Sequence, residues 1–99
     1  MRVEEAALAS ALQRAFAEAG SPDIDEIASS GIGVSARQIT DWRTGRNLPT
    51  AFRDLEPLIA YLQVAAAATS QVSRRHRIRE VTTWPTPRWR QLWESAAHL

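Results

Sequence analysis

The clearest pattern in this sequence is a stripe of apolar side chains at helical spacing near the middle of the chain. Four residues stand at positions i, i+3, i+4 and i+7, which lie on one face of an α-helix: Leu55, Leu58, Ile59 and Leu62. Pro57 falls inside the stripe, so the helix either begins near Asp54 or is kinked at the proline. The alanines at 65–68 extend the helix by propensity. Such a stripe needs other helices to cover it.

Two further segments supply helices of the same kind. The first runs from Val3 to Ala19, where an apolar residue recurs every fourth position: Leu8, Leu12 and Phe16. Gly20 is a natural stop after it. At the other end, Thr86 as N-cap and Pro87 as first helical residue open a helix to Ala97. With the two helices described below, we expect an all-α, compact five-helix bundle.

The amino-acid composition limits which classes of protein this chain can belong to. Ninety-nine residues, 44% hydrophobic and 23% charged, suit one globular domain over 1–99 with its core in 3–64. The chain has no cysteine and only two histidines, His76 and His98, so we expect no disulfide, no metal site and no cofactor. We find no run of 18 apolar residues and no signal-peptide pattern, which predicts a cytoplasmic protein without a membrane partner.

Charge is distributed unevenly along the chain. Residues 1–30 contain two Arg and six Asp or Glu, whereas residues 61–99 contain six Arg and two Glu. The chain is therefore acidic at its start and basic toward its end. The two ends nearly cancel, and the formal net charge is only +1. The densest positive segment, S-R-R-H-R-I-R-E, lies within 72–81. It is either an arm that contacts phosphates or a solvated connector.

A helix-turn-helix is predicted at 23–44. Asp23 is the candidate N-cap of a short first helix, with Glu26 at the spacing of a capping box. Gly31 and Gly33 allow a tight turn. Ser35 is the candidate N-cap of the second helix. In that helix Ile39 and Trp42 should point inward, while four polar residues fall on the opposite face: Arg37, Thr40, Asp41 and Thr44.

The stretch from Val34 to Pro49, V-S-x-x-x-I-x-x-W-R-x-G-R-x-x-P, resembles the Cro and lambda-repressor-like helix-turn-helix family, also called the xenobiotic response element type. The resemblance covers roughly Ala7 to Leu62. It departs from the family pattern in a turn about one residue longer and in Arg43, where an acidic residue is common. The resemblance implies a transcriptional regulator that binds double-stranded DNA in a sequence-specific manner, usually as a homodimer.

Helix-turn-helix proteins insert the N-terminal residues of the second helix into the major groove. The residues expected to read bases are Ser35, Arg37, Gln38, Thr40 and Asp41. Arginine can donate two hydrogen bonds to guanine, and glutamine can pair with adenine. The residues expected to contact phosphates are Arg43, Arg46, Asn47, Arg74 and Arg75. The structural alternatives are an Arg37–Asp41 ion pair and arginines that satisfy carbonyls at the helix end.

Three tryptophans near the C-terminus, Trp84, Trp89 and Trp93, present a large apolar area. They form either a face for a second copy or another partner, or a cover for the first and fourth helices.

The sequence contains no recognisable catalytic motif. No nucleophile and base stand at a known spacing, and no glycine-rich phosphate loop is present, so we expect no enzymatic function. The alternative to DNA binding is a protein-interaction module, for example part of a larger signalling or defence protein. The salt dependence of binding distinguishes the two functions. Binding to DNA phosphates weakens steeply as the salt concentration rises, whereas binding through a dry tryptophan interface barely changes.

Overall fold

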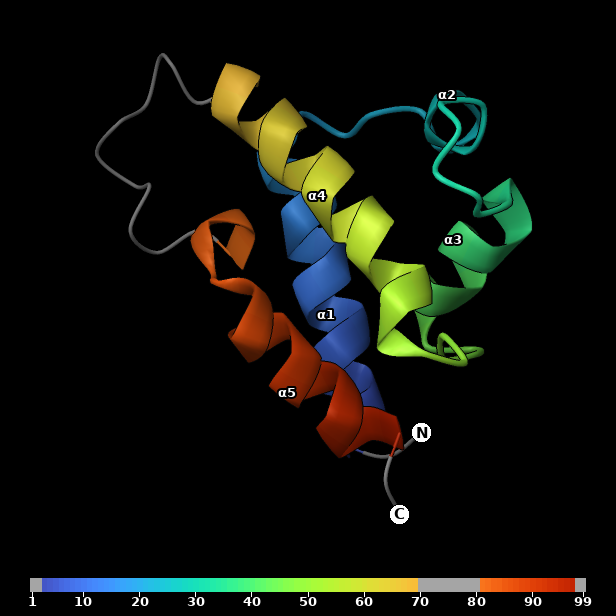
Figure 1. Ribbon diagram of the computed structural model, residues 1–99, viewed down its shortest axis with the longest axis vertical. Coiled ribbons are helices and arrows are strands. Elements are labelled where there is room, and N and C mark those ends of the chain that lie inside the picture. The colour runs from blue at the N-terminus through green and yellow to red at the C-terminus, as the bar shows by residue number, and fades with distance from the viewer. Residues whose placement is uncertain (1–2, 70–80, 98–99) are drawn as a thin grey trace.

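The computed structural model describes residues 3–69 and 81–97, and all regular structure in these residues is helical. The five α-helices and one short 3-10 helix are α1 (Val3–Glu18), α2 (Ile24–Ala28), α3 (Ala36–Thr44), α4 (Phe52–Thr69), η3 (Val81–Thr83) and α5 (Thr86–Ala97) (Figure 1). The prediction of an all-α protein with five helices is confirmed. No described helix is long and apolar enough to cross a membrane.

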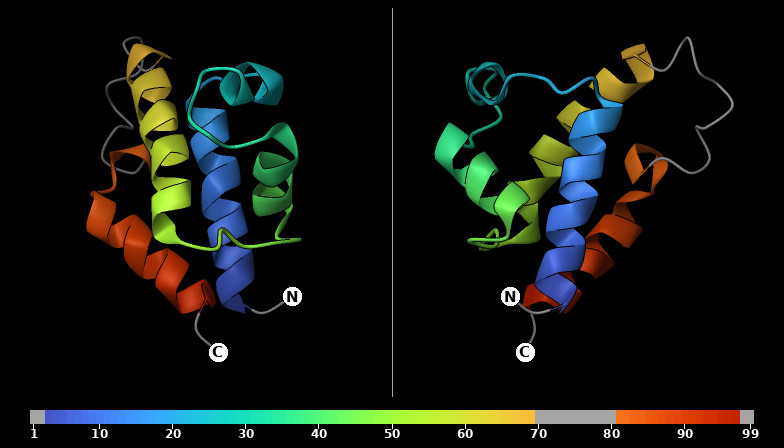
Figure 2. Two further views of the ribbon diagram at one scale, coloured as in Figure 1. Left: turned by 45° about the vertical axis from the view of Figure 1, so that its right-hand side comes forward. Right: turned by 180° about the vertical axis from the view of Figure 1, so that it is seen from behind.

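Helix α1 lies at the centre of the molecule. It contacts α3, α4 and α5, and α3 and α5 lie on opposite sides of the α1–α4 pair in every view (Figures 1 and 2). The predicted stripes face each other in the core, where Leu12, Leu55 and Leu58 are each 0% exposed. The core was predicted within 3–64, but it also includes Val81, Trp89 and Ala96. The C-terminal helix is therefore part of the core.

The end of α1 shows how the chain turns toward α2. The amide of Ser21 donates to the carbonyl of Phe16 at 2.8 Å, and Gly20, with φ +85°, donates to Ala17 at 3.1 Å. This is the Schellman arrangement, which needs a left-handed residue that glycine adopts without strain. Gly20 thus ends the helix as predicted, with Glu18 as its last residue. The chain then continues into α2.

The starts of three helices differ in detail from the sequence predictions. The carboxylate of Asp23 caps α2 by accepting from the amide of Asp25 at 3.0 Å, instead of the capping box expected with Glu26. Helix α4 begins at Phe52 and continues through Pro57. Pro57 is the sixth residue of α4, beyond the first turn, so it offers no amide donor to the Arg53 carbonyl within the helix.

Helix α5 begins one position earlier than the sequence indicated. The first acceptor is the carbonyl of Pro85, which accepts from the amide of Arg88 at 3.0 Å. Thr86 is consequently the first helical residue and not the N-cap, and Pro87 is the second. The predicted range of 86–97 is otherwise confirmed.

Candidate nucleic-acid interface

Helix α3 lies at the outer edge of the molecule, on the side opposite α5 (Figure 2). Ile39, 0% exposed, and Trp42, 5% exposed, anchor it to the core as predicted. Four of its predicted base-reading residues are exposed to solvent: Ser35, Arg37, Gln38 and Thr40. A helix held by two large side chains on one face thus offers its polar face outward.

The N-terminus of α3 is closed by a reciprocal pair of hydrogen bonds. The hydroxyl of Ser35 accepts from the amide of Gln38 at 3.1 Å, and the side-chain oxygen Oε1 of Gln38 accepts from the amide of Ser35 at 2.9 Å. This is a capping box. The sequence analysis identified the cap but missed the part played by Gln38, although the S-x-x-Q spacing signals it. Because Oε1 is engaged, pairing with adenine competes with the capping bond.

This cap leads to a prediction about stability. We expect Ser35→Ala to lower the free energy of unfolding by about 1 kcal/mol, because the Gln38 amide at the start of α3 then loses its protein partner. Thr40→Ala, an equally exposed change on the same helix, should alter it by less than about 0.5 kcal/mol. Urea denaturation followed by circular dichroism measures both. Equal losses in the two variants would contradict a capping role for Ser35.

Asp41 and Asn47 are engaged with each other. The side-chain amide of Asn47 donates to the Asp41 carboxylate at 3.0 Å, and the Asp41 carbonyl accepts from the amide of Arg46 at 2.9 Å. Half-buried Asp41 therefore holds the loop that follows α3. The predicted contacts of Asp41 with cytosine and of Asn47 with a phosphate stay predictions, and in the free protein the two side chains contact each other.

Arg43 is also drawn into the fold. Its guanidinium lies 4.5 Å from the centre of the Phe16 ring, and its carbonyl accepts from the Gln13 side chain at 2.7 Å. A guanidinium over a ring face is a favourable cation–π contact. The half-buried Arg43 side chain thus packs α3 on α1. The predicted phosphate contact of Arg43 stays a prediction, because the contact with Phe16 uses the face of the guanidinium and not its N–H donors.

Two predicted arginines remain available. Arg37 and Arg46 are exposed, and neither side chain has an ion pair or hydrogen bond with any residue in 3–69 or 81–97, so the alternative Arg37–Asp41 ion pair is not formed. Arg74 and Arg75 lie outside the described residues. We call the exposed set Ser35, Arg37, Gln38, Thr40 and Arg46 the α3 surface. It extends from the first turn of α3 to the loop beyond its C-terminus.

A polar cleft of about 280 Å³ lies beside the α3 surface. It separates α3 from the start of α4, and its lining residues are Gln38, Asp41, Trp42, Asn47, Leu48, Thr50 and Asp54. The loop after α3 forms one wall of this cleft, so the position of the loop sets the shape of the surface next to α3.

The three tryptophans pack inward, which is the second of the two arrangements that the sequence left open. Trp89 is 1% exposed and its indole N–H donates to the carbonyl of Val81 at 3.2 Å. Trp84 and Trp93 are half-buried. Trp84 packs on Trp89 with ring centres 5.3 Å apart and planes tilted by 51°. Much of their apolar area is used in closing the core.

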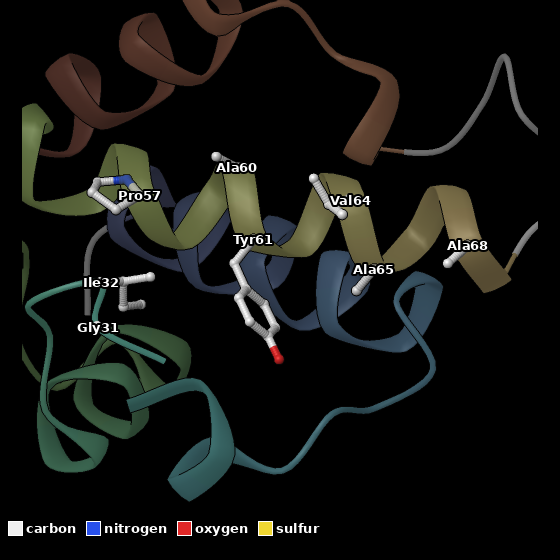
Figure 3. A pocket seen from close by; sticks show the side chains of 8 residues that line it. All are labelled: Gly31, Ile32, Pro57, Ala60, Tyr61, Val64, Ala65 and Ala68. Atoms are coloured by element: carbon white, nitrogen blue, oxygen red, sulfur yellow. The ribbon is translucent and has the colours of Figure 1, made fainter. Parts of the chain in front are cut away.

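A separate apolar groove of about 750 Å³ runs along the outer face of α4 (Figure 3). Gly31 and Ile32 of the turn between α2 and α3 form one side, and Pro57, Ala60, Tyr61, Val64, Ala65 and Ala68 form the other. Val64 is 72% exposed, and none of the lining residues is charged. The sequence analysis missed this groove because Ile32 and α4 meet only in the folded chain.

The described residues contain no group of three or more His, Asp or Glu side chains arranged to hold a metal ion. Comparisons of the chain with protein-family models, curated proteins and solved structures found no match.

Proposed function

We propose that the protein is a sequence-specific DNA-binding transcriptional regulator of the Cro and lambda-repressor-like helix-turn-helix type, with α3 as the helix that enters the major groove. The observation that carries the proposal is the α3 surface: a short capped helix at the molecular edge with an exposed Arg37 in its first turn, whose side chain has no ion pair within residues 3–69 and 81–97. The proposal includes a cytoplasmic homodimer and no enzymatic activity.

The packing of α2 against α3 supports this proposal. The two helices contact each other, and Ile27, Val34 and Ile39 are all buried in the common core. The seven residues between Ala28 and Ala36 include Gly31 and Gly33, both with positive φ. A rigid pair of helices is what a groove reader needs, because base contacts require a fixed helix orientation.

The charges on and beside α3 are compatible with a DNA phosphate backbone. Arg37 and Arg46 bring positive charge to the exposed surface, whereas the one acidic residue of α3, Asp41, is half-buried and accepts from Asn47. The bond from Asn47 directs the carboxylate toward the loop. Repulsion between Asp41 and phosphates is thereby reduced, and the two arginines supply the attraction.

Binding to a pool of random-sequence duplexes at low and moderate salt tests the proposal. We expect an enriched motif, with Arg37→Ala losing about 1–3 kcal/mol of discrimination at one base pair. Arg46→Ala should weaken all sequences alike and make the salt dependence shallower by about one phosphate contact. Arg88→Ala is the matched control, because Arg88 lies on α5, opposite α3, over the Trp84 ring. Absence of binding by the wild type at low salt would refute DNA binding.

The apolar groove favours a second function, that of a protein-interaction module. Uncharged side chains line the groove, and an exposed Val64 is the kind of residue that a partner protein covers. Binding through this groove should be nearly insensitive to salt and should be lost in Val64→Asp. Binding through the α3 surface should be strongly salt-dependent and should survive Val64→Asp.

A further inference from the structure

The loop that connects α3 to α4, residues 45–51, is held firmly at its first end. The amides of Arg46 and Asn47 donate to the Asp41 carbonyl at 2.9 and 3.4 Å, and the Asn47 side chain donates to the Asp41 carboxylate at 3.0 Å. Gly45 takes the left-handed conformation, φ +77°, that ends α3. These contacts join the loop to the helix proposed to read DNA.

The second end of the loop is held from α5. The indole N–H of Trp93 donates to the carbonyl of Pro49 at 3.0 Å, across 44 positions of sequence. The ring of Trp93 also packs on Phe52, the first residue of α4, with centres 6.3 Å apart and planes tilted by 55°. Helix α5 lies on the far side of the α1–α4 pair, yet it reaches the loop where the loop enters α4 (Figure 2).

The chemistry of Pro49 makes this single bond important. Proline has no amide proton, so its carbonyl is the only backbone group through which Pro49 can be held by a hydrogen bond. Pro49 is buried, and a buried carbonyl requires a partner. The Trp93 indole, which can only donate, supplies that partner. No other hydrogen bond to the Pro49 carbonyl is formed within the described residues.

We infer that Trp93 is a positioning residue for DNA binding: through the Pro49 carbonyl, α5 fixes the loop that carries Arg46 and borders the α3 surface. This inference rests on the proposed function. It gives α5 a role beyond closing the core, because the packing of α5 then determines the position of Arg46, the residue of the loop proposed to contact a phosphate.

The variant that tests the inference is Trp93→Phe. Phenylalanine keeps an aromatic ring beside Phe52 and removes the N–H donor, so the buried Pro49 carbonyl loses its partner. We expect the affinity for a random-sequence duplex to fall about five- to tenfold, the effect of one lost hydrogen bond. We also expect the salt dependence to become shallower by about one phosphate contact, because Arg46 is no longer held in place.

Trp84→Phe is the matched control. Trp84 is also half-buried, packs on Trp89 and lies under the Arg88 guanidinium at 3.9 Å, and its indole donates no hydrogen bond to residues 3–69 or 81–97. The same chemical change is thus made near α5 without touching the loop. Duplex affinity and its salt dependence should stay at wild-type values.

A measurement without DNA separates a positioning effect of Trp93 on the loop from a general loss of stability. Amide hydrogen exchange should become about tenfold faster at Arg46, Asn47 and Asp54 in Trp93→Phe, because these loop-flanking amides depend on a fixed loop, and should not change in Trp84→Phe. If the wild type binds DNA and the two variants behave alike in exchange and affinity, the positioning role is overturned and the proposed function stands. If the wild type binds no duplex, the proposed function fails and the inference fails with it.

Discussion

Trp89→Ala should lower the free energy of unfolding by about 3–5 kcal/mol, a large share of the stability of a small domain. Trp89 is the largest fully buried side chain of the described residues. Its removal leaves a cavity between α5 and α1, and the buried Val81 carbonyl loses the indole N–H that lies 3.2 Å away. Chemical denaturation followed by far-UV circular dichroism measures the loss without relying on tryptophan fluorescence.

Leu92→Ala provides the comparison for Trp89→Ala. Leu92 lies three residues further along α5 and packs against the same core, but it is only half-buried. Its truncation should cost about 1 kcal/mol. If Trp89→Ala also cost about 1 kcal/mol or less, α5 would not be docked on the core in solution. The tryptophans would then be available as the partner face that their sequence also allowed.

The second large effect is expected at Glu18. Its carboxylate, at the end of α1, accepts from the amides of Val81 and Thr82 at 3.0 and 2.9 Å and from the Thr82 hydroxyl at 2.9 Å. Val81 and Thr82 are buried, so Glu18→Ala leaves these donors without their partner. We expect a loss of about 2–3 kcal/mol in the free energy of unfolding.

Two further variants make the Glu18 prediction specific. Glu18→Gln keeps an acceptor oxygen but not the charge, so it should lose about half as much stability. Glu56→Ala removes an exposed carboxylate from α4 and should change stability by less than about 0.5 kcal/mol. Amide exchange at Val81 and Thr82 should rise in Glu18→Ala. Unchanged exchange there would show that the carboxylate does not hold η3 in solution.

The local features of the fold were readable from the sequence. The four-residue spacing of Leu8, Leu12 and Phe16 identified α1 and its buried face. The Ser35 cap and the inward direction of Ile39 and Trp42 were also correct. These features depend on residues within one or two turns of each other, so the period of apolar residues and the capping chemistry are sufficient to specify them.

The candidate site was readable only in part. Placement of Arg37 and Thr40 on an exposed surface follows from helix geometry alone. The engagement of Arg43 by Phe16 does not, because the two residues belong to different helices that meet only when α3 packs on α1. A polar side chain near a helix end can face solvent or a neighbouring helix, and its sequence position does not distinguish them.

The sequence by itself determined which segments are helical and which face of each is apolar. The tertiary structure decided what each face covers. It directed the tryptophans of α5 into the core, brought Glu18 to Val81 across 63 positions and placed the Trp93 indole on the Pro49 carbonyl. The physical reason is that periodicity records only local geometry, whereas these contacts depend on how whole helices pack against one another.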